Sequence, residues 1–257
     1  MKKLVLANQK GGVGKSAIVT QLAYYFSELG LRVLVIDIDH QGNSSKAIAK
    51  SGLATVSKLT SEMLLLKKVD AVEKQPFVLI PASNELKKLE KQGELHNTYA
   101  NNLKAFFDSV NDQFDICIID TNPNPDIRLI SALVTSDFVL SPIQLNQEAL
   151  DGIGALKRDI TAIQQKINKN LVFIGILPNI VEPTPFQREN FAQLSAHYSD
   201  LMIRLDNGTI AAIQKRSAIA EAQANCQPFW KIAKSTGRST WTEVKPVFEQ
   251  IKKVMGV

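Results

Sequence analysis

Cysteine, long apolar runs and linker-like segments are all scarce in this chain of 257 residues. Its two cysteines, Cys117 in an apolar stretch and Cys226 in a polar one, form neither a disulfide framework nor a metal-binding spacing, which fits a reducing compartment. The longest purely apolar runs, such as residues 63–66, are too short to span a bilayer. Met1 leads directly into an expected strand, without a signal peptide. We therefore expect a cytoplasmic protein.

Repeats and linkers are also absent, so nothing in the sequence divides the chain. Its length is within the reach of one α/β domain, and a hydrophobic content of 45% is ordinary for a globular core. We therefore expect residues 1–257 to form a single domain, with a basic C-terminal region at 204–257 inside it.

Apolar, β-branched runs alternate along the chain with helical patterns. This alternation predicts βαβ units and an α/β fold, with a mainly parallel twisted sheet flanked by helices on both faces. A helix is expected over residues 15–29, ended by Gly30. The expected strands are residues 3–8, 32–37, 77–80, 114–120, 137–142 and 171–178.

The most informative stretch follows the first expected strand and reads NQKGGVGKSA over residues 8–17. Three glycines within four positions allow backbone N–H groups to converge on an oxyanion without a Cβ in the way. Lys15 supplies a mobile positive charge, and the Ser16 hydroxyl supplies an oxygen ligand for Mg²⁺. The stretch therefore predicts a P-loop that binds a nucleoside triphosphate, although Gln9 stands where the ordinary pattern has its first glycine, and a second lysine, Lys10, follows.

Two of the expected strands end in carboxylates. Asp37 and Asp39 lie one residue apart at the end of a strand and therefore share a face, and Asp120 closes the strand at 114–120. Carboxylates beside a phosphate loop suit the coordination shell of Mg²⁺ and the orientation of an attacking water. Strand-end carboxylates that only cap the next turn are the alternative.

The segments ANQKGGVGKS at residues 7–16 and RVLVIDIDHQGN at residues 32–43 resemble the ParA/MinD family of deviant-Walker ATPases. The likeness is greatest to the ParA (Soj) branch, in the form that lacks an N-terminal helix-turn-helix domain. The resemblance implies a P-loop NTPase fold, ATP and Mg²⁺ as cofactors, and an ATPase that is slow without its partner.

The resemblance also implies roles for individual residues. Asp39 would position the attacking water, Asp120 would hold the Mg²⁺ shell, and Asp37 would support the switch loop or the water shell of the metal. Lys10 would reach across a nucleotide-sandwich dimer to the ATP of the partner. The predicted catalytic residues are Lys10, Lys15 and Asp39, and the predicted metal site consists of Ser16, Asp37, Asp39 and Asp120. The predicted nucleotide contacts are Lys10, Gly11, Gly12, Val13, Gly14, Lys15, Ser16, Ala17 and Asn179.

Two positions depart from the family pattern, and a third has two interpretations. Asn122 stands in a loop where the family usually has proline, and Ala17 stands where the family often has threonine. Asn179 follows the strand that ends near Leu177 and resembles the position from which related ATPases read the adenine edge. The Pro178-Asn179 pair is equally an ordinary turn signal.

The positive charge of the chain is concentrated at its C-terminal end. Residues 204–257 hold nine Lys or Arg against four acids, which equals the whole net charge of +5. Residues 213–222 resemble a DNA-contacting stretch of the family, with Lys215 at one arginine position and Arg216 as a substitute for a second one that falls on Ala218. The predicted DNA-binding residues are Lys215, Arg216, Lys231, Lys234 and Arg238. We expect sequence-independent, salt-sensitive binding to duplex DNA, a solvated helical surface being the alternative.

The last segment has the pattern of an amphipathic helix. Its apolar face consists of Trp241, Val244, Phe248, Ile251 and Met255. Thr240 and Glu243 have the spacing of a capping box, and Pro246 predicts a kink or a later helix start. A membrane-surface helix, as in the MinD branch, would use Lys245, Lys252 and Lys253. We expect instead a helix docked on the sheet, and no membrane binding.

Together these features predict an ATP-dependent DNA-partition ATPase that is cytoplasmic and associated with the nucleoid. Its expected partners are nonspecific duplex DNA, a ParB-like centromere-binding protein and, with ATP, a second copy of the chain. A MinD-like or cargo-positioning ATPase is the alternative, and a nucleotide-binding scaffold without turnover remains open. A nitrogenase-type iron protein would need cluster cysteines, which the two cysteines do not supply.

Overall fold

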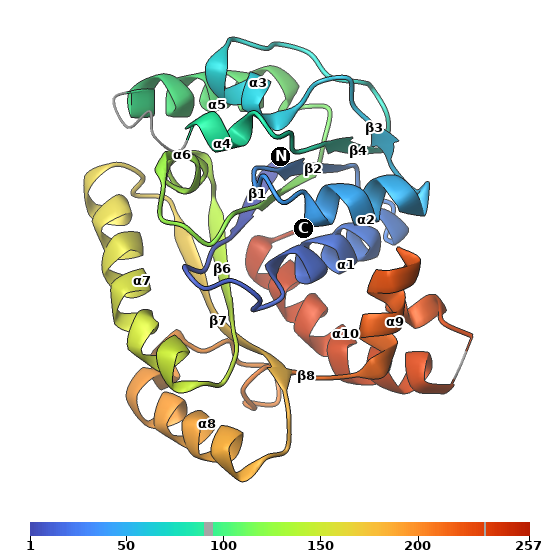
Figure 1. Ribbon diagram of the computed structural model, residues 1–257, viewed down its shortest axis with the longest axis vertical. Helices are drawn as coiled ribbons and strands as arrows, with labels where there is room; N and C mark the ends of the chain where they lie inside the picture. Colours follow the sequence, from blue (N-terminus) through green and yellow to red (C-terminus); the bar gives the residue numbers. More distant parts are fainter. Residues whose placement is uncertain (90–94, 234) are drawn as a thin grey trace.

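The computed structural model describes residues 1–89, 95–233 and 235–257, apart from the side chains of 96 and 148–151. Its centre is one sheet with the strand order β3-β4-β2-β5-β1-β6-β7-β8, in which every pair of neighbours is parallel (Figure 1). Helices cover both faces, so the predicted α/β class is confirmed. The first strand lies at the centre, and the phosphate loop therefore starts in the middle of the sheet.

All six expected strands are present, and two more lie at the edges of the sheet. The two that the sequence pattern missed, β3 and β8, have only two residues each, which is too short to show a periodic pattern. The strands are β1 Lys2–Leu6, β2 Val33–Asp37, β3 Thr55–Val56, β4 Phe77–Ile80, β5 Ile116–Asp120, β6 Phe138–Ile143, β7 Val172–Val181 and β8 Ile213–Gln214.

The expected helix after the phosphate loop is α1, which begins at Lys15 and ends at Glu28. Gly30 follows with φ of 81°, the left-handed conformation that ends a helix at low cost for glycine. The remaining helices are α2 Asn43–Ser51, α3 Ser61–Leu66, α4 Leu86–Leu89, α5 His96–Val110, α6 Ile127–Thr135, α7 Gln147–Lys166, α8 Pro185–Tyr198, α9 Ser217–Asn225 and α10 Ser235–Met255, with short 3₁₀ turns at Ser199–Leu201 and Phe229–Lys231.

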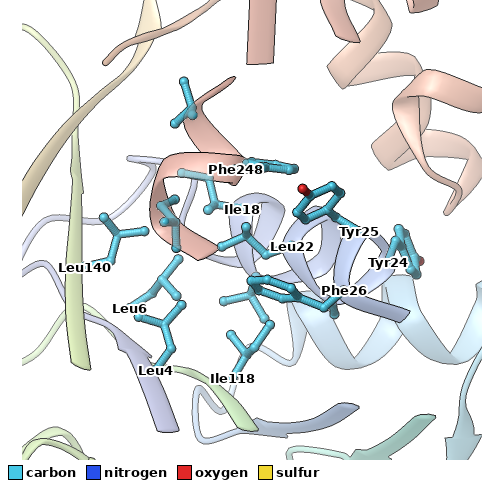
Figure 2. Close-up of a cluster of buried hydrophobic side chains, with 14 of the residues drawn as sticks. Leu4, Leu6, Ile18, Leu22, Tyr24, Tyr25, Phe26, Ile118, Leu140 and Phe248 are labelled. Carbon is cyan, nitrogen blue, oxygen red and sulfur yellow. The ribbon is translucent and has the colours of Figure 1, made fainter. Parts of the chain in front are cut away.

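Alternate residues of the central strands point to opposite faces of the sheet. Leu4 and Leu6 of β1 join one core with α1, α9 and α10, whereas Val5 joins a second core with α3, α5, α6 and α7. Figure 2 shows the first core, which includes Leu6 of β1 and Ile18 of α1. Since both faces are covered, the inner strands are largely apolar, as in other parallel sheets.

The C-terminal helix differs in part from its prediction. It begins at Ser235, so Thr240 lies buried inside the helix and the predicted capping box is wrong. Pro246 also lies inside the continuous helix. The helix tolerates this proline because most of its apolar face is buried against α1 and the sheet, which outweighs one lost backbone hydrogen bond. Four of the five predicted face residues are buried and the fifth packs against them: Val244, Phe248, Ile251 and Met255, with Trp241.

Within the part of the chain that the structure describes, every helix is too short or too polar to cross a membrane.

Candidate nucleotide-binding site

The sheet brings the phosphate loop and the acidic strand ends to one edge. Asp120, the last residue of β5, is the register partner of Leu6 in β1 and of Asp37 in β2. The loop between β1 and α1 therefore begins beside both carboxylates. This edge, at the carboxyl ends of parallel strands, is the usual place for ligands in open α/β sheets.

The loop geometry requires glycine at two positions. Gly12 and Gly14 have φ of 77° and 87°, the left-handed region that side chains with a Cβ rarely adopt. A Cβ on Gly14 would also lie 2.3 Å from Nδ2 of Asn179. Gly11 has no such constraint, since a Cβ there would meet nothing within 4 Å. The loop therefore leads through Gly14 directly into the N-terminus of α1, whose backbone N–H groups attract anions.

Lys15 lies folded over this loop. Its Nζ donates hydrogen bonds to the carbonyl oxygens of Asn8 and Lys10 at 3.2 and 3.3 Å. Burial lowers the pKa of Lys15, and the charges of Asp120 and Asp39 oppose this change. The ammonium group is therefore positioned between the loop and the two carboxylates, where the phosphates of a nucleotide would bind.

Side chains from neighbouring strand ends hold the loop in place. Nδ2 of Asn8 donates to the carbonyl of Pro142 at 2.6 Å, and Gln144 Nε2 donates to the carbonyl of Gly12 at 3.1 Å. Nδ2 of Asn179 donates to the carbonyl of Val13 at 2.8 Å. The roles of Asn8 and Gln144 were not predicted, because nothing in the linear pattern shows that β6 ends beside the loop. Asn179 was expected at the base, and the structure places it against the phosphate loop.

Asp37 is completely buried, and both oxygens of its carboxylate accept hydrogen bonds. Oδ2 accepts hydrogen bonds from the backbone N–H and the hydroxyl of Ser45 at 2.9 and 2.6 Å, and Oδ1 accepts one from the N–H of Asp39 at 3.1 Å. Burial raises the pKa of Asp37, and the hydrogen bonds from Ser45 oppose the rise. Of the two roles expected for Asp37, this geometry fits support of the loop before α2 better than contact with a metal.

Asp120 differs from Asp37 in that its carboxylate accepts no hydrogen bond from the described residues. Both of its carboxylate oxygens are buried. Burial, followed by the charge of Asp37, raises the pKa of Asp120 to about 7, while the nearby Ser16 and Ser44 hydroxyls, which do not reach hydrogen-bonding geometry with it, and the charge of Lys15 oppose the rise. A buried carboxyl group without partners is stabilised either by a proton or by a nearby cation, so Asp120 fits the Mg²⁺ site that the sequence predicts.

Asp39 lies nearer the surface and is 7% exposed. Its Oδ1 accepts a hydrogen bond from the backbone N–H of Gln41 at 3.0 Å, and its side chain lines the same cavity as Ser16 and Ala17. Among the described residues, no three His, Cys, Asp or Glu side chains cluster into a metal cage. A metal at Asp120 would therefore depend on oxygens from a bound phosphate and water, as Mg²⁺ commonly does.

The cavity at this edge has a volume of about 610 Å³, which suits a ligand of nucleotide size. It extends from the phosphate loop to Asn179 and Ile180 near the end of β7, and on to α9 and α10. Its far wall is largely apolar. That wall includes Ile213, Ile219, Phe229, Val244 and Phe248. The site thus combines a polar end for phosphates with an apolar end that suits a flat base.

Lys10 contacts its own chain in this structure. Its Nζ donates a hydrogen bond to Oδ1 of Asn146, just before α7, at 3.1 Å. Next to it, Nε2 of Gln9 donates to Oδ2 of Asp159 in α7 at 2.7 Å. The side of the loop that carries the extra lysine is therefore tied to α7.

Three of the five residues predicted to bind DNA form ion pairs with acids. Lys215 pairs with Glu182 at 2.8 Å. Arg216 pairs with Glu243 of α10 at 2.8 Å, and Lys231 pairs with Glu28 at the end of α1. Lys215 and Arg216 also line the nucleotide cavity, whereas Lys231 lies at the far end of α1. Arg238 lies in the first turn of α10, and Lys234 lies outside the described residues.

Comparison with known proteins matches residues 1–173 to a family described as an AAA domain. The IncC protein of Escherichia coli is 35% identical, over 98% of this chain and 69% of its own length. The chromosome-partitioning ATPase Soj of Thermus thermophilus is 30% identical, over 78% of each chain.

Two solved structures are similar to this one. Cobyrinic acid a,c-diamide synthase of Mycobacterium smegmatis, with bound ADP and magnesium, is 25% identical, with a TM-score of 0.72 over 88% of this chain and 91% of the other. A variant of McdA from Cyanothece in complex with ATP is 20% identical, with a TM-score of 0.80 over 100% and 97% of the chains. The second likeness concerns the fold alone.

Proposed function

This chain belongs to the ParA/Soj family of P-loop partition ATPases, whose cofactors are ATP and Mg²⁺, and from this premise we propose that it couples ATP hydrolysis to the partition of a DNA cargo. The observation that carries the proposal is the pair of unpartnered carboxylate oxygens of Asp120 beside Lys15. Carboxylate oxygens kept without hydrogen bonds beside a phosphate-binding lysine suit the Mg²⁺ ion that accompanies a nucleoside triphosphate.

The residues at the carboxyl ends of the central strands have separate roles in hydrolysis. Backbone N–H groups of the loop and Lys15 bind the phosphates, and Ser16 with Asp120 holds Mg²⁺ directly or through its waters. Mg²⁺ bound there neutralises charge on the phosphate oxygens. Asp39 orients the attacking water from the mouth of the cavity, and Asp37 fixes the loop that carries Asp39.

Lys10 acts between two copies of the chain. Lys15 already supplies a positive charge to the phosphates of its own nucleotide, so a second lysine on the other side of the loop suits the nucleotide of a partner. Each bound ATP then stabilises the dimer by mass action, and hydrolysis releases it.

The DNA surface centres on Lys215 and Arg216. Both lie at the start of α9, at the rim of the nucleotide cavity, so nucleotide-driven assembly brings the basic groups of two copies together. Their ion pairs with Glu182 and Glu243 are exposed and weak, and phosphates can replace these acids. A ParB-like protein on the cargo stimulates hydrolysis and releases the DNA.

The test is ATP turnover and DNA binding over a salt series, with nonspecific duplex DNA. The parent protein is expected to bind DNA with ATP but not with ADP, and binding should fall steeply as salt rises. The double variant K215E/R216E should lose DNA binding and keep nucleotide binding. K166E/K169E, with the same charge change in and after the last turn of α7, is the control that should behave like the parent.

Two results would count against this proposal. DNA binding that survives in K215E/R216E would refute the placement of the surface. Turnover that is indifferent to DNA, together with ATP-dependent sedimentation with liposomes, would favour the membrane- or cargo-positioning alternative.

A further inference from the structure

A buried ion pair lies just beyond the loop that follows Asp120. Arg128, in the first turn of α6, is 0% exposed. Its Nε and Nη2 donate to Oδ2 of Asp126 at 3.0 and 2.5 Å, and its Nη1 donates to the carbonyl oxygen of Leu86 at 3.2 Å. The guanidinium therefore connects the start of α6 to the start of α4.

The same carboxylate is connected back to the loop. Nδ2 of Asn122 donates to Oδ2 of Asp126 at 2.8 Å. Asn122 lies two residues after Asp120 and is fully buried, and its Oδ1 has no partner among the described residues. A proline, which is usual at this position in the family, could not make this bond. The hydrogen bonds thus run from Asn122 through Asp126 and Arg128 to Leu86.

Helix capping alone does not require this arrangement. Oδ1 of Asp126 accepts a hydrogen bond from the backbone N–H of Arg128 at 2.9 Å, which already caps α6. Burying a guanidinium as well carries a desolvation penalty that an ion pair often fails to recover. What the pair does provide is a fixed geometry, since the planar fork of arginine holds the carboxylate in one orientation.

We propose that Asn122, Asp126 and Arg128 form a positioning unit that fixes the loop after Asp120 in the arrangement needed for hydrolysis. The proposal rests on the proposed ATPase function and adds three residues to it. None of the three lines the nucleotide cavity. They act through the loop, so their loss is expected to slow turnover and leave nucleotide binding intact.

The test uses D126N, because asparagine keeps the helix cap but removes the charge that orients Arg128. We expect kcat to fall by about 10- to 100-fold, as misplacements of about 1 Å commonly cause, at an unchanged Kd for a non-hydrolysable ATP analogue. N122A, which keeps the ion pair and removes only its link to the loop, should lower kcat in the same direction. Amide hydrogen exchange of residues 121–126 should rise in both variants.

The control is K3M, which removes the partly buried ion pair between Lys3 and Asp137. This pair lies at the amino ends of β1 and β6, away from the nucleotide site. K3M should lower the melting temperature without changing kcat. A D126N protein with the kcat of the parent, whatever its melting temperature, overturns the proposal, and so does a parallel loss of analogue binding. If the parent itself does not hydrolyse ATP, the proposed function fails, which is a different outcome.

Discussion

Gly14 is the residue of the nucleotide site with the least room for change. Its φ is 87°, and a Cβ would press against the amide of Asn179. We expect G14A to weaken ATP binding by at least about tenfold. A residue with a Cβ held at this positive φ either costs about 1–3 kcal/mol of backbone strain or displaces the loop. G152A is the matched control, since Gly152 lies in α7, does not line the cavity, and a Cβ there meets nothing within 4 Å. Titration with a fluorescent ATP analogue compares the two, and equal affinities would contradict the assignment of the phosphate loop.

Asp120 makes the nucleotide-free protein sensitive to pH. Its pKa is raised to about 7 in the folded state, from an ordinary value near 4 in the unfolded chain. The folded state therefore holds a proton that the unfolded state has lost between these values, and the stability from this proton disappears as pH rises through 7. Melting temperatures in a chelator should therefore fall between about pH 4 and pH 7 and level off above pH 7, and D120N should flatten the fall.

The same carboxylate links pH to cofactor binding. Mg²⁺ requires the ionised form, so the affinity for Mg²⁺ at a fixed ATP concentration should rise up to about pH 7 and then level off. D120N should bind Mg²⁺–ATP weakly at every pH. Parallel pH profiles for the parent and D120N would show that another group is responsible.

At the scale of elements, α10 is a structural wall of the nucleotide cavity. Phe248 is 1% exposed, packs against Tyr25 of α1 and Phe229, and lines the cavity. F248A should reduce the free energy of unfolding by about 3–5 kcal/mol and weaken nucleotide binding. V254A, on the exposed side of the same helix, should change stability by less than about 0.5 kcal/mol. Urea denaturation measures both, and similar losses would mean that the buried face does not hold the helix.

The elements also show what the sequence could predict. Continuous apolar runs predicted the six longer strands, because the sheet is buried on both faces, and helical periodicity predicted α1 and the buried face of α10, because burial on one face of a helix leaves a regular spacing. The start of α10 was predicted wrongly, since a local Thr240–Glu243 pattern is outweighed by packing over the whole helix. The side chains that hold the phosphate loop, Asn8 and Gln144, come from segments far apart in the chain, and only the strand order brings them together.

For the whole molecule, the proposed assembly of two copies makes a prediction about size. The parent should elute as a dimer with ATP and as a monomer with ADP. D39A, which would bind ATP without positioning the attacking water, should remain dimeric for longer. K10A should remain monomeric with ATP while its Kd for ATP stays near that of the parent. Size-exclusion chromatography with light scattering measures these states, and a K10A protein that dimerises and hydrolyses like the parent would remove Lys10 from the interface.

The contact between Lys10 and Asn146 has a consequence for how such a dimer comes apart. To reach a neighbouring triphosphate, the lysine must give up a bond inside its own subunit, so docking is an exchange of one polar contact for another. Once the γ-phosphate is gone, Lys10 contributes little to the free energy of dimerisation, and its Nζ can return to the hydrogen bond with Oδ1 of Asn146. A dimer held in this way would dissociate readily after each turnover, and each subunit could then bind ATP again.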